Sequence, residues 1–142
     1  MGIGGRAVAA RTILRRVAAL SLLVLSGCAA ACPEGLRPGV ATTLFFGTAR
    51  LNAPDVTEAE WRAFLTDTAI PKLSGLTVTD GLGLYREKDG SAASERSKVV
   101  VTAHQGAPAE MRAIAEVMET YRRRFGQWGV GRLDQPACTG FD

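Results

Sequence analysis

The sequence predicts an α+β domain of the ferredoxin-like type, a split βαβ (βαββαβ) fold with a four-stranded antiparallel sheet and two helices on one face. Strand-type and helix-type hydrophobic patterns follow one another in the order strand, helix, strand, strand, helix, strand. The 142-residue chain also opens with the pattern of an export leader, and the length that remains suits one modest core.

Residues 1–27 have the parts of a signal peptide of the lipoprotein type. Four arginines, at positions 6, 11, 15 and 16, precede or adjoin an apolar run from Val17 to Leu25. That run covers nine positions, whereas a transmembrane helix needs about 20. The segment is therefore expected to direct export and to be removed.

The residues Leu25-Ser26-Gly27-Cys28 predict cleavage before Cys28 and attachment of lipid to its thiol. The mature protein is then expected in the periplasm or at the cell surface, bound to the membrane through this anchor. In a Gram-negative bacterium, Ala29 after the cysteine favours the outer membrane. The competing interpretation is ordinary cleavage after Ala31, which would release a protein that begins at Cys32.

Residues 28–40 are rich in alanine, proline and glycine, a composition that predicts a tether, so a single domain is expected over residues 41–142. The β-branched and aromatic run Thr42–Gly47 predicts its first strand.

The first helix is predicted to begin at Thr57, because Thr57 and Glu60 have the spacing of a capping box. Pro71 predicts its end near Ile70. Its inner stripe is expected to comprise Trp61, Phe64, Leu65 and Thr68.

A long strand is predicted over Gly75–Arg86, where apolar residues alternate with small or polar ones. Asp89-Gly90 is a hairpin signal, and Lys98–His104 predicts the strand that returns from it. The second helix is expected to begin at Pro108, which suits the first helical position. Its apolar stripe is predicted as Met111, Ile114, Ala115, Met118, Tyr121 and Phe125. A last strand is predicted over Gln127–Leu133, before Pro136.

The charge of the mature chain argues against nucleic acid as a partner. The full chain has 17 basic and 14 acidic residues, and removal of residues 1–27 takes away four arginines and no acid. The 13 basic and 14 acidic residues that remain give a formal net charge of −1. The basic character therefore belongs to the leader and not to the folded domain.

The two cysteines that remain beside Cys28 are expected to pair outside the cytoplasm. A bridge between Cys32 and Cys138 would tie the start of the domain to its end. Unpaired thiols or a redox role are the alternatives, although no C-x-x-C pair supports redox chemistry or a zinc site. Cys28 and Cys32 could pair only in a form without lipid.

Asp80 and His104 are the candidate ionisable site residues. Asp80 interrupts an apolar strand face, so it predicts either a buried carboxylate paired with Arg50, Arg96, Lys98 or Arg132, or a bulge beside Gly81 that turns it outward. His104 ends the third strand and is expected at the surface. No pattern of catalytic or metal-ligating residues predicts an active site, and no cofactor is expected.

The motifs in the second half have ordinary structural interpretations. Arg122-Arg123-Arg124 is expected to complement the dipole at the end of the second helix. The pair Ser97 and Lys98, beside Glu95, lacks the S-x-x-K spacing of a nucleophile with its base.

A string of short motifs runs through the predicted domain: Phe46-Gly47, Arg50, Val56-Thr57, Glu60-Trp61, Phe64, Gly75-Leu76-Thr77-Val78, Asp80-Gly81, Gly83, Arg86, Glu95, Ser97-Lys98-Val99, Tyr121, Arg124-Phe125, Gln127, Cys138 and Phe141. Together they resemble a family of small exported bacterial proteins known only as a domain of unknown function, number thirty-five seventy-four. The resemblance covers about residues 40–142 and implies no assigned activity. Tyr85 and Trp128-Gly129 depart from the family pattern, which usually has a tryptophan and a small polar pair at these places.

The sheet face without helices is the surface expected to carry function. Thr77, Thr79 and Tyr85 should lie on it, with Phe45, Thr102 and His104 if the register places them there. The leading hypothesis is a non-enzymatic envelope protein whose open face binds a partner or a second copy, as a homodimer. The alternatives are a small-molecule module that uses Arg50, Asp80 and Tyr85, and a cofactor-free enzyme that uses Asp80 or His104 for proton transfer.

Overall fold

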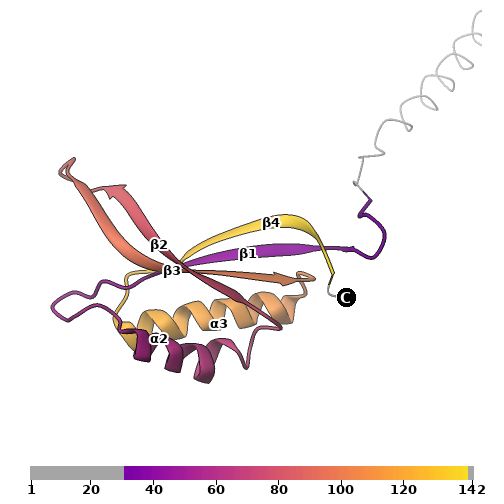
Figure 1. The fold of residues 1–142 in the computed structure, drawn as a ribbon, viewed down its shortest axis with the longest axis horizontal. Coiled ribbons are helices and arrows are strands. Elements are labelled where there is room, and N and C mark those ends of the chain that lie inside the picture. The colour runs from indigo at the N-terminus through magenta and orange to yellow at the C-terminus, as the bar shows by residue number, and fades with distance from the viewer. Residues whose placement is uncertain (1–30, 141–142) are drawn as a thin grey trace, which may run out of the picture. The chain divides into compact units, whose positions relative to one another are not determined.

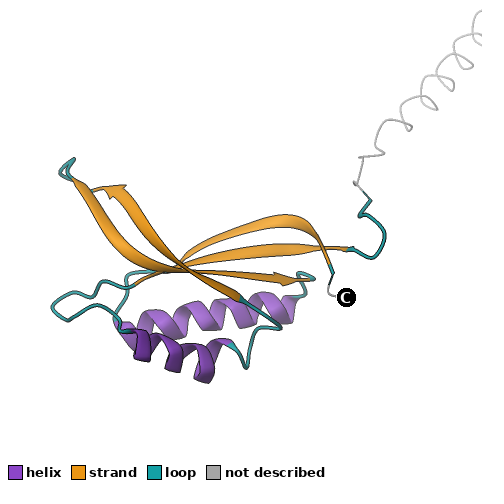
Figure 2. Ribbon diagram, viewed as in Figure 1, coloured by secondary structure: helices purple, strands orange, loops and turns teal. Residues whose placement is uncertain are grey.

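The computed structural model describes residues 31–140, so the predicted leader and Cys28 lie outside the described residues. Figure 2 shows that this part of the chain folds into strands with helices on one side of them. The elements are β1 (Arg37–Gly47), α2 (Glu58–Phe64), a π-helical segment (Leu65–Ala69), β2 (Thr77–Arg86), β3 (Ala92–His104), α3 (Pro108–Phe125) and β4 (Gly131–Thr139).

The strands form one antiparallel sheet in the order β2-β3-β1-β4. Each helix connects two strands that are not neighbours in the sheet, and both helices cover the same face (Figure 1). This is the arrangement of a split βαβ fold. The ferredoxin-like fold predicted from the sequence is confirmed.

Two strand boundaries differ from the predicted ones at the edge formed by β1 and β4. β1 begins at Arg37, so the last residues of the predicted tether belong to the sheet, where Arg37 pairs with Thr139. β4 covers Gly131–Thr139 and contains Pro136, which was expected to lie beyond the last strand. Because β4 is an edge strand, it has no outer neighbour that needs the amide proton that proline lacks.

A disulfide joins Cys32 to Cys138, with 5.5 Å between their Cα atoms. The predicted pairing of these two cysteines is therefore present in the structure. Cys138 lies opposite Pro38 in the β1–β4 ladder, so the bond fixes the chain just before β1 to the end of β4.

The helix α2 begins as its sequence predicts. The Thr57 hydroxyl accepts a hydrogen bond from the Glu60 amide, and the Glu60 carboxylate accepts one from the Thr57 amide, which completes the capping box. Such a cap stabilises a helix by about 1 kcal/mol. The helix then widens into the π-helical segment, where the Ile70 amide donates to the Leu65 carbonyl at 2.9 Å.

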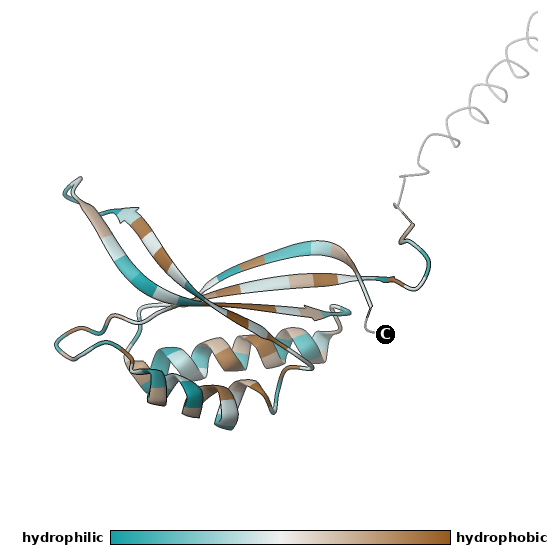
Figure 3. Cartoon of the chain, in the orientation of Figure 1, coloured by the Kyte–Doolittle hydropathy of each residue, from teal (hydrophilic) through white to brown (hydrophobic). Residues whose placement is uncertain are grey.

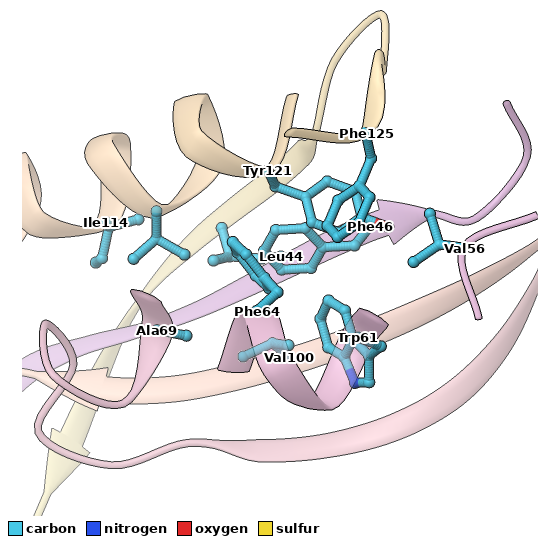
Figure 4. Close-up of a cluster of buried hydrophobic side chains, with 11 residues drawn as sticks. Leu44, Phe46, Val56, Trp61, Phe64, Ala69, Val100, Ile114, Tyr121 and Phe125 are labelled. Atoms are coloured by element: carbon cyan, nitrogen blue, oxygen red, sulfur yellow. The ribbon is translucent and has the colours of Figure 1, made fainter. Parts of the chain in front are cut away.

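An aromatic cluster fills the space between the sheet and the helices (Figure 4). Phe46 of β1 lies with its ring centroid 4.7 Å from that of Tyr121 and 5.3 Å from that of Trp61. In α3 the buried stripe includes Val117, whereas Ala115, which was predicted to face inward, is exposed. The buried apolar residues are Leu44, Phe46, Val56, Trp61, Phe64, Ala69, Val100, Ile114, Val117, Tyr121 and Phe125.

The β2–β3 hairpin continues beyond the end of β1 and beyond the helices (Figure 1). The last pair between β1 and β3 is Gly47 with Ser97, whereas β2 and β3 remain paired as far as Arg86 and Ala92. This extension carries alternating apolar residues along β2 (Figure 3). Leu82 and Leu84 are exposed here because no helix lies beneath them, although the strand pattern predicted an inward face.

Candidate functional site

Six residues were expected on the open sheet face, three of them only if the strand register allowed it. Four of the six lie there. The register places Thr77, Thr79 and Tyr85 of β2 on this face together with Phe45 of β1. Phe45 is 43% exposed and pairs with Val99 on one side and Gly131 on the other. Thr102 and His104 do not belong to this face, because both are buried on the helix side.

A groove of about 750 Å³ lies on this side of the sheet, where the hairpin extends past β1. We call it the Trp128 groove. Its aromatic residues are Phe45, Tyr85 and Trp128, and Trp128 is 93% exposed. The complete lining is Phe45, Gly47, Ala49, Arg50, Leu51, Gly83, Leu84, Tyr85, Glu87, Glu95, Ser97, Gly126, Gln127, Trp128, Gly129 and Gly131.

Glu95 brings a carboxylate to the groove next to Gly47. A Cβ atom built on Gly47 would overlap the Glu95 carboxylate, so a larger residue at this position would displace the Glu95 side chain. The Ala49 amide donates to Glu95 Oε1 at 3.1 Å and holds the side chain in place. Glu95 pairs with Gly83 across the hairpin, which makes Tyr85 its diagonal neighbour on the same face.

The rim of the groove is tied together around Ala49. The Gln127 side-chain amide donates to the Ala49 carbonyl at 2.6 Å, while the Ala49 amide holds Glu95. Below the rim, the buried Tyr121 hydroxyl donates to the Gly47 carbonyl at 2.8 Å. Burial raises the pKa of the Tyr121 hydroxyl, and the Glu95 charge adds to the effect. These contacts connect the base of the groove to the aromatic core.

Arg50 lines the groove, but its guanidinium is already committed to other partners. It donates to the carbonyls of Pro54 and Asp55 and forms an ion pair with Glu60 at 2.6 Å. The guanidinium also lies 5.7 Å from the centre of the Phe125 ring. Arg50 therefore fixes the loop that precedes α2 through its Nε and Nη2 groups, whereas its Nη1 group makes no hydrogen bond to residues 31–140.

Acid should weaken the fold through Glu60. The Arg50 hydrogen bond and the Thr57 cap lower the pKa of the Glu60 carboxyl from 4.5 to about 2. A carboxyl whose pKa is lower in the folded state stabilises the fold above its unfolded pKa, and this contribution disappears as the pH falls through the folded pKa. We expect the urea midpoint to fall between about pH 4.5 and 2, and to fall less in Glu60→Gln. An NMR titration of Glu60 with a midpoint near 4.5 would contradict the assignment.

Asp80 lies on the helix side of β2, which is an edge strand of the sheet, and its side chain is not buried. No bulge turns it outward. Its side chain is 83% exposed, and the register with β3 continues through the Asp80–Lys98 pair. Lys98, one of the predicted partners, bridges Asp80 and Glu58 at 2.6 Å each. The two carboxylates raise the pKa of Lys98. Asp80 therefore helps to join the start of α2 to the sheet.

His104 belongs to a buried hydrogen-bonded chain, although the sequence suggested a surface position. The Gly106 amide donates to Nδ1 at 3.0 Å, which assigns the ring proton to Nε2. Nε2 then donates to the Thr42 hydroxyl at 2.9 Å, and that hydroxyl donates to Asp134 at 2.6 Å. Arg132 pairs with Asp134 at 2.9 Å and lowers the pKa of its carboxyl, with the Thr42 hydroxyl as a further cause.

Thr42→Val should destabilise the protein by about 1–3 kcal/mol, because it leaves the buried His104 Nε2–H without an acceptor. Thr43→Val changes the neighbouring residue on the opposite sheet face in the same way and should have a much smaller effect. Urea unfolding of the two variants measures the difference. Equal losses of stability would contradict the role of the His104 chain.

The structure does not bring Asp80 and His104 together. Asp80 pairs with Lys98 and His104 ends the same strand β3 six positions later, a separation of about 20 Å along a strand. The enzymatic hypothesis that joins them in one pocket therefore lacks its geometry. Within residues 31–140, no group of three or more acidic, histidine or cysteine side chains is placed to hold a metal ion. In the same range, no helix is long and apolar enough to cross a membrane.

The fold and the groove define a small ferredoxin-like domain with one open sheet face. The chain belongs to a family of proteins of unknown function (DUF3574), whose model matches residues 41–141. The resemblance found in the sequence is thereby confirmed. A comparison with the curated proteins finds no match.

Two solved structures with a similar fold are phage proteins. One is a phage SAM lyase in complex with S-methyl-5′-thioadenosine, with 15% identity, a TM-score of 0.54, and coverage of 78% of this chain and 88% of the lyase chain. The other is a phage SAM lyase in the apo state, with 21% identity, a TM-score of 0.55, and coverage of 77% and 91%. At these identities the likeness concerns the fold alone.

Sequence reasoning selected Arg50 and Tyr85, which both line the groove, but missed the importance of Glu95, Gln127 and Trp128. Two signals were present in the sequence. Glu95 and Gln127 belong to the motifs that carry the family resemblance, and Trp128 stands out as a large aromatic residue between glycine-rich neighbours. What the sequence lacked was the tertiary arrangement that places these distant residues around one groove.

Proposed function

We propose that the protein is an exported lipoprotein whose folded domain binds a small molecule in the Trp128 groove. The observation that carries this proposal is the exposed Trp128 ring at the edge of a groove that Phe45 and Tyr85 also line. A volume of about 750 Å³ falls within the range of about 300–1,000 Å³ that is usual for small-molecule sites. An indole that is almost fully exposed is costly in water and typical of recognition surfaces.

The residues that resemble the family support the same place. Six of them, from four separate segments of the chain, line the groove: Gly47, Arg50, Gly83, Glu95, Ser97 and Gln127. The similar fold of the phage SAM lyase, which has been captured with S-methyl-5′-thioadenosine, makes a nucleoside-like compound a reasonable first probe. Aromatic residues such as Tyr85 and Trp128 suit a flat ring of this kind.

Native mass spectrometry of protein purified from the cell envelope, together with titration by S-methyl-5′-thioadenosine, tests the proposal. The two tryptophans give separate indole N–H signals in an NMR spectrum, and Trp61 is buried in the core. We expect a ligand to shift the Trp128 signal and to leave that of Trp61 in place. Trp128→Ala should weaken binding about tenfold or more, since stacking on an aromatic ring contributes about 1–3 kcal/mol. A ligand that binds Trp128→Ala as tightly as the unchanged protein would contradict the site.

Self-association is a second candidate, favoured by the centre of the open face. Val101 and Leu133 both pair with Thr43 and are 43% and 48% exposed, so with Phe45 they form an apolar surface across three strands. Such a surface suits a second copy of the chain. Sedimentation should then show a dimer that Leu133→Lys converts to a monomer. A monomer at high concentration would remove this candidate.

The proposed anchor rests on Cys28, four positions before Cys32. Intact-mass measurement of the membrane-associated protein, with and without reductant, reports on lipid and on the Cys32–Cys138 bond together. We expect a mature chain that begins at Cys28, carries a diacylglyceryl group on its thiol, and gains two hydrogen atoms when the reductant opens the disulfide. A mature chain that begins at Cys32 would contradict the anchor.

A further inference from the structure

We infer that the Trp128 groove takes an organic cation, such as a molecule with an alkylated ammonium centre. This inference rests on the proposed function, because it specifies the ligand of the same groove. It depends on two independent features of the lining, namely the balance of charges and the aromatic rings.

The charged side chains of the groove leave an excess of negative charge. Three residues of the lining are charged, Arg50, Glu87 and Glu95. The Arg50 charge is matched by Glu60, which it contacts at 2.6 Å. Neither Glu87 nor Glu95 takes part in any of the ion pairs found within residues 31–140. A groove with such a lining attracts a cation and repels an anion.

Glu95 is the better placed of the two carboxylates. It is half-buried at the junction of β3 with the end of β1, and the Ala49 amide fixes one of its oxygens. A fixed carboxylate loses little conformational entropy when it meets a ligand.

The aromatic rings favour an organic cation over a metal ion. Tyr85 is the diagonal neighbour of Glu95, and Phe45 and Trp128 line the same groove. Aromatic faces attract alkylated cations, and cages of such rings are a recurrent way of recognising them. A metal ion would instead require several oxygen or nitrogen ligands at close range, and the groove offers two carboxylates on separate parts of the hairpin, Glu87 near its turn and Glu95 near its base.

Two arginines that adjoin lining residues in the sequence, Arg86 and Arg132, have other partners. Arg86 donates to the Gly90 carbonyl at the hairpin turn, and Arg132 pairs with Asp134 on the helix side of the sheet. Neither appears in the lining of the groove.

The test compares choline with 3,3-dimethylbutan-1-ol, which has the same shape but a neutral carbon in place of the nitrogen. Binding is followed by the Trp128 indole N–H signal of the full mature protein, with Trp61 as the internal control. We expect choline to bind about tenfold more tightly than the neutral alcohol. Glu95→Gln should remove most of this preference while keeping an oxygen that can accept the Ala49 hydrogen bond. Glu116→Gln makes the same change on α3, outside the groove, and should leave the preference unchanged.

The outcomes separate this inference from the function on which it rests. Equal affinities for the two compounds, or a preference that survives in Glu95→Gln, would overturn the cationic ligand and leave the groove as a binding site. If a nucleoside shifts the Trp128 signal and neither choline nor the neutral alcohol does, the cationic ligand is likewise overturned and the groove remains a binding site. If no compound shifts the Trp128 signal and native mass spectrometry shows no retained molecule, the proposed function itself fails.

Discussion

Phe46→Ala is expected to lower the free energy of unfolding by about 3–5 kcal/mol, because it removes the ring that connects both helices to the sheet. Phe46 is almost fully buried, and its ring lies against those of Trp61, Phe64 and Tyr121. For a domain of this size the melting temperature should fall by roughly 15–25 °C. Calorimetry or urea unfolding measures the loss.

Phe45→Ala is the matched control, since Phe45 is the next residue along β1 and points to the open face. Its ring is half-exposed, so the same truncation should cost less than about 1.5 kcal/mol. Similar losses for the two variants would mean that the register of β1 is wrong by one residue, because such a shift exchanges the two faces of a strand.

Loss of the Cys32–Cys138 bond should destabilise the protein by about 4–5 kcal/mol on the chain-entropy model. The bond closes a loop with a sequence separation of 106, so the unfolded chain gains much freedom when it is broken. The double variant Cys32→Ser, Cys138→Ser should therefore unfold at a markedly lower urea concentration. The comparison is made in a background with Cys28→Ser, so that no third thiol can exchange.

Reduction provides the independent check on this prediction. Dithiothreitol should lower the urea midpoint of the protein that has both cysteines and leave that of the double variant unchanged. A midpoint that does not respond to reductant would show that the bond adds nothing to the pairing of β1 with β4.

Local signals determined the parts of the fold that could be predicted from sequence. Thr57 and Glu60 form the predicted capping box, Pro108 begins α3, and Asp89-Gly90 lies in the turn between β2 and β3. In each case a short-range interaction fixes the backbone, so neighbouring residues contain enough information. The order of the elements then restricted the sheet to few topologies.

Strand ends were harder to predict because pairing partners determine them. Arg37 and Thr139 are in strands because they pair with each other beside a disulfide, and neither local sequence has a strong strand pattern. In the same way, Ala92 belongs to β3 because Arg86 of β2 pairs with it. Tertiary contacts therefore lengthen three strands beyond the limits that propensity suggests.

Asp80 and His104 show why the candidate site could be predicted only in part. Their residue types suggested chemistry, but the neighbours that satisfy them come from other elements: Lys98 and Glu58 for Asp80, and Thr42 for His104. Conversely, the rings and carboxylates of the Trp128 groove come from four segments that are distant in the sequence. The register of the sheet, together with the connection between α3 and β4 that carries Trp128, brings them together.

Mapping of backbone amide shifts on addition of a bound compound tests the central claim, that the Trp128 groove is the binding site, most directly. We predict that the perturbed amides cluster at Gly47, Gly83, Glu95 and Gly131, together with the Trp128 indole. Perturbations centred instead on Val101 and Leu133, or on the buried His104–Thr42–Asp134 chain, would contradict it.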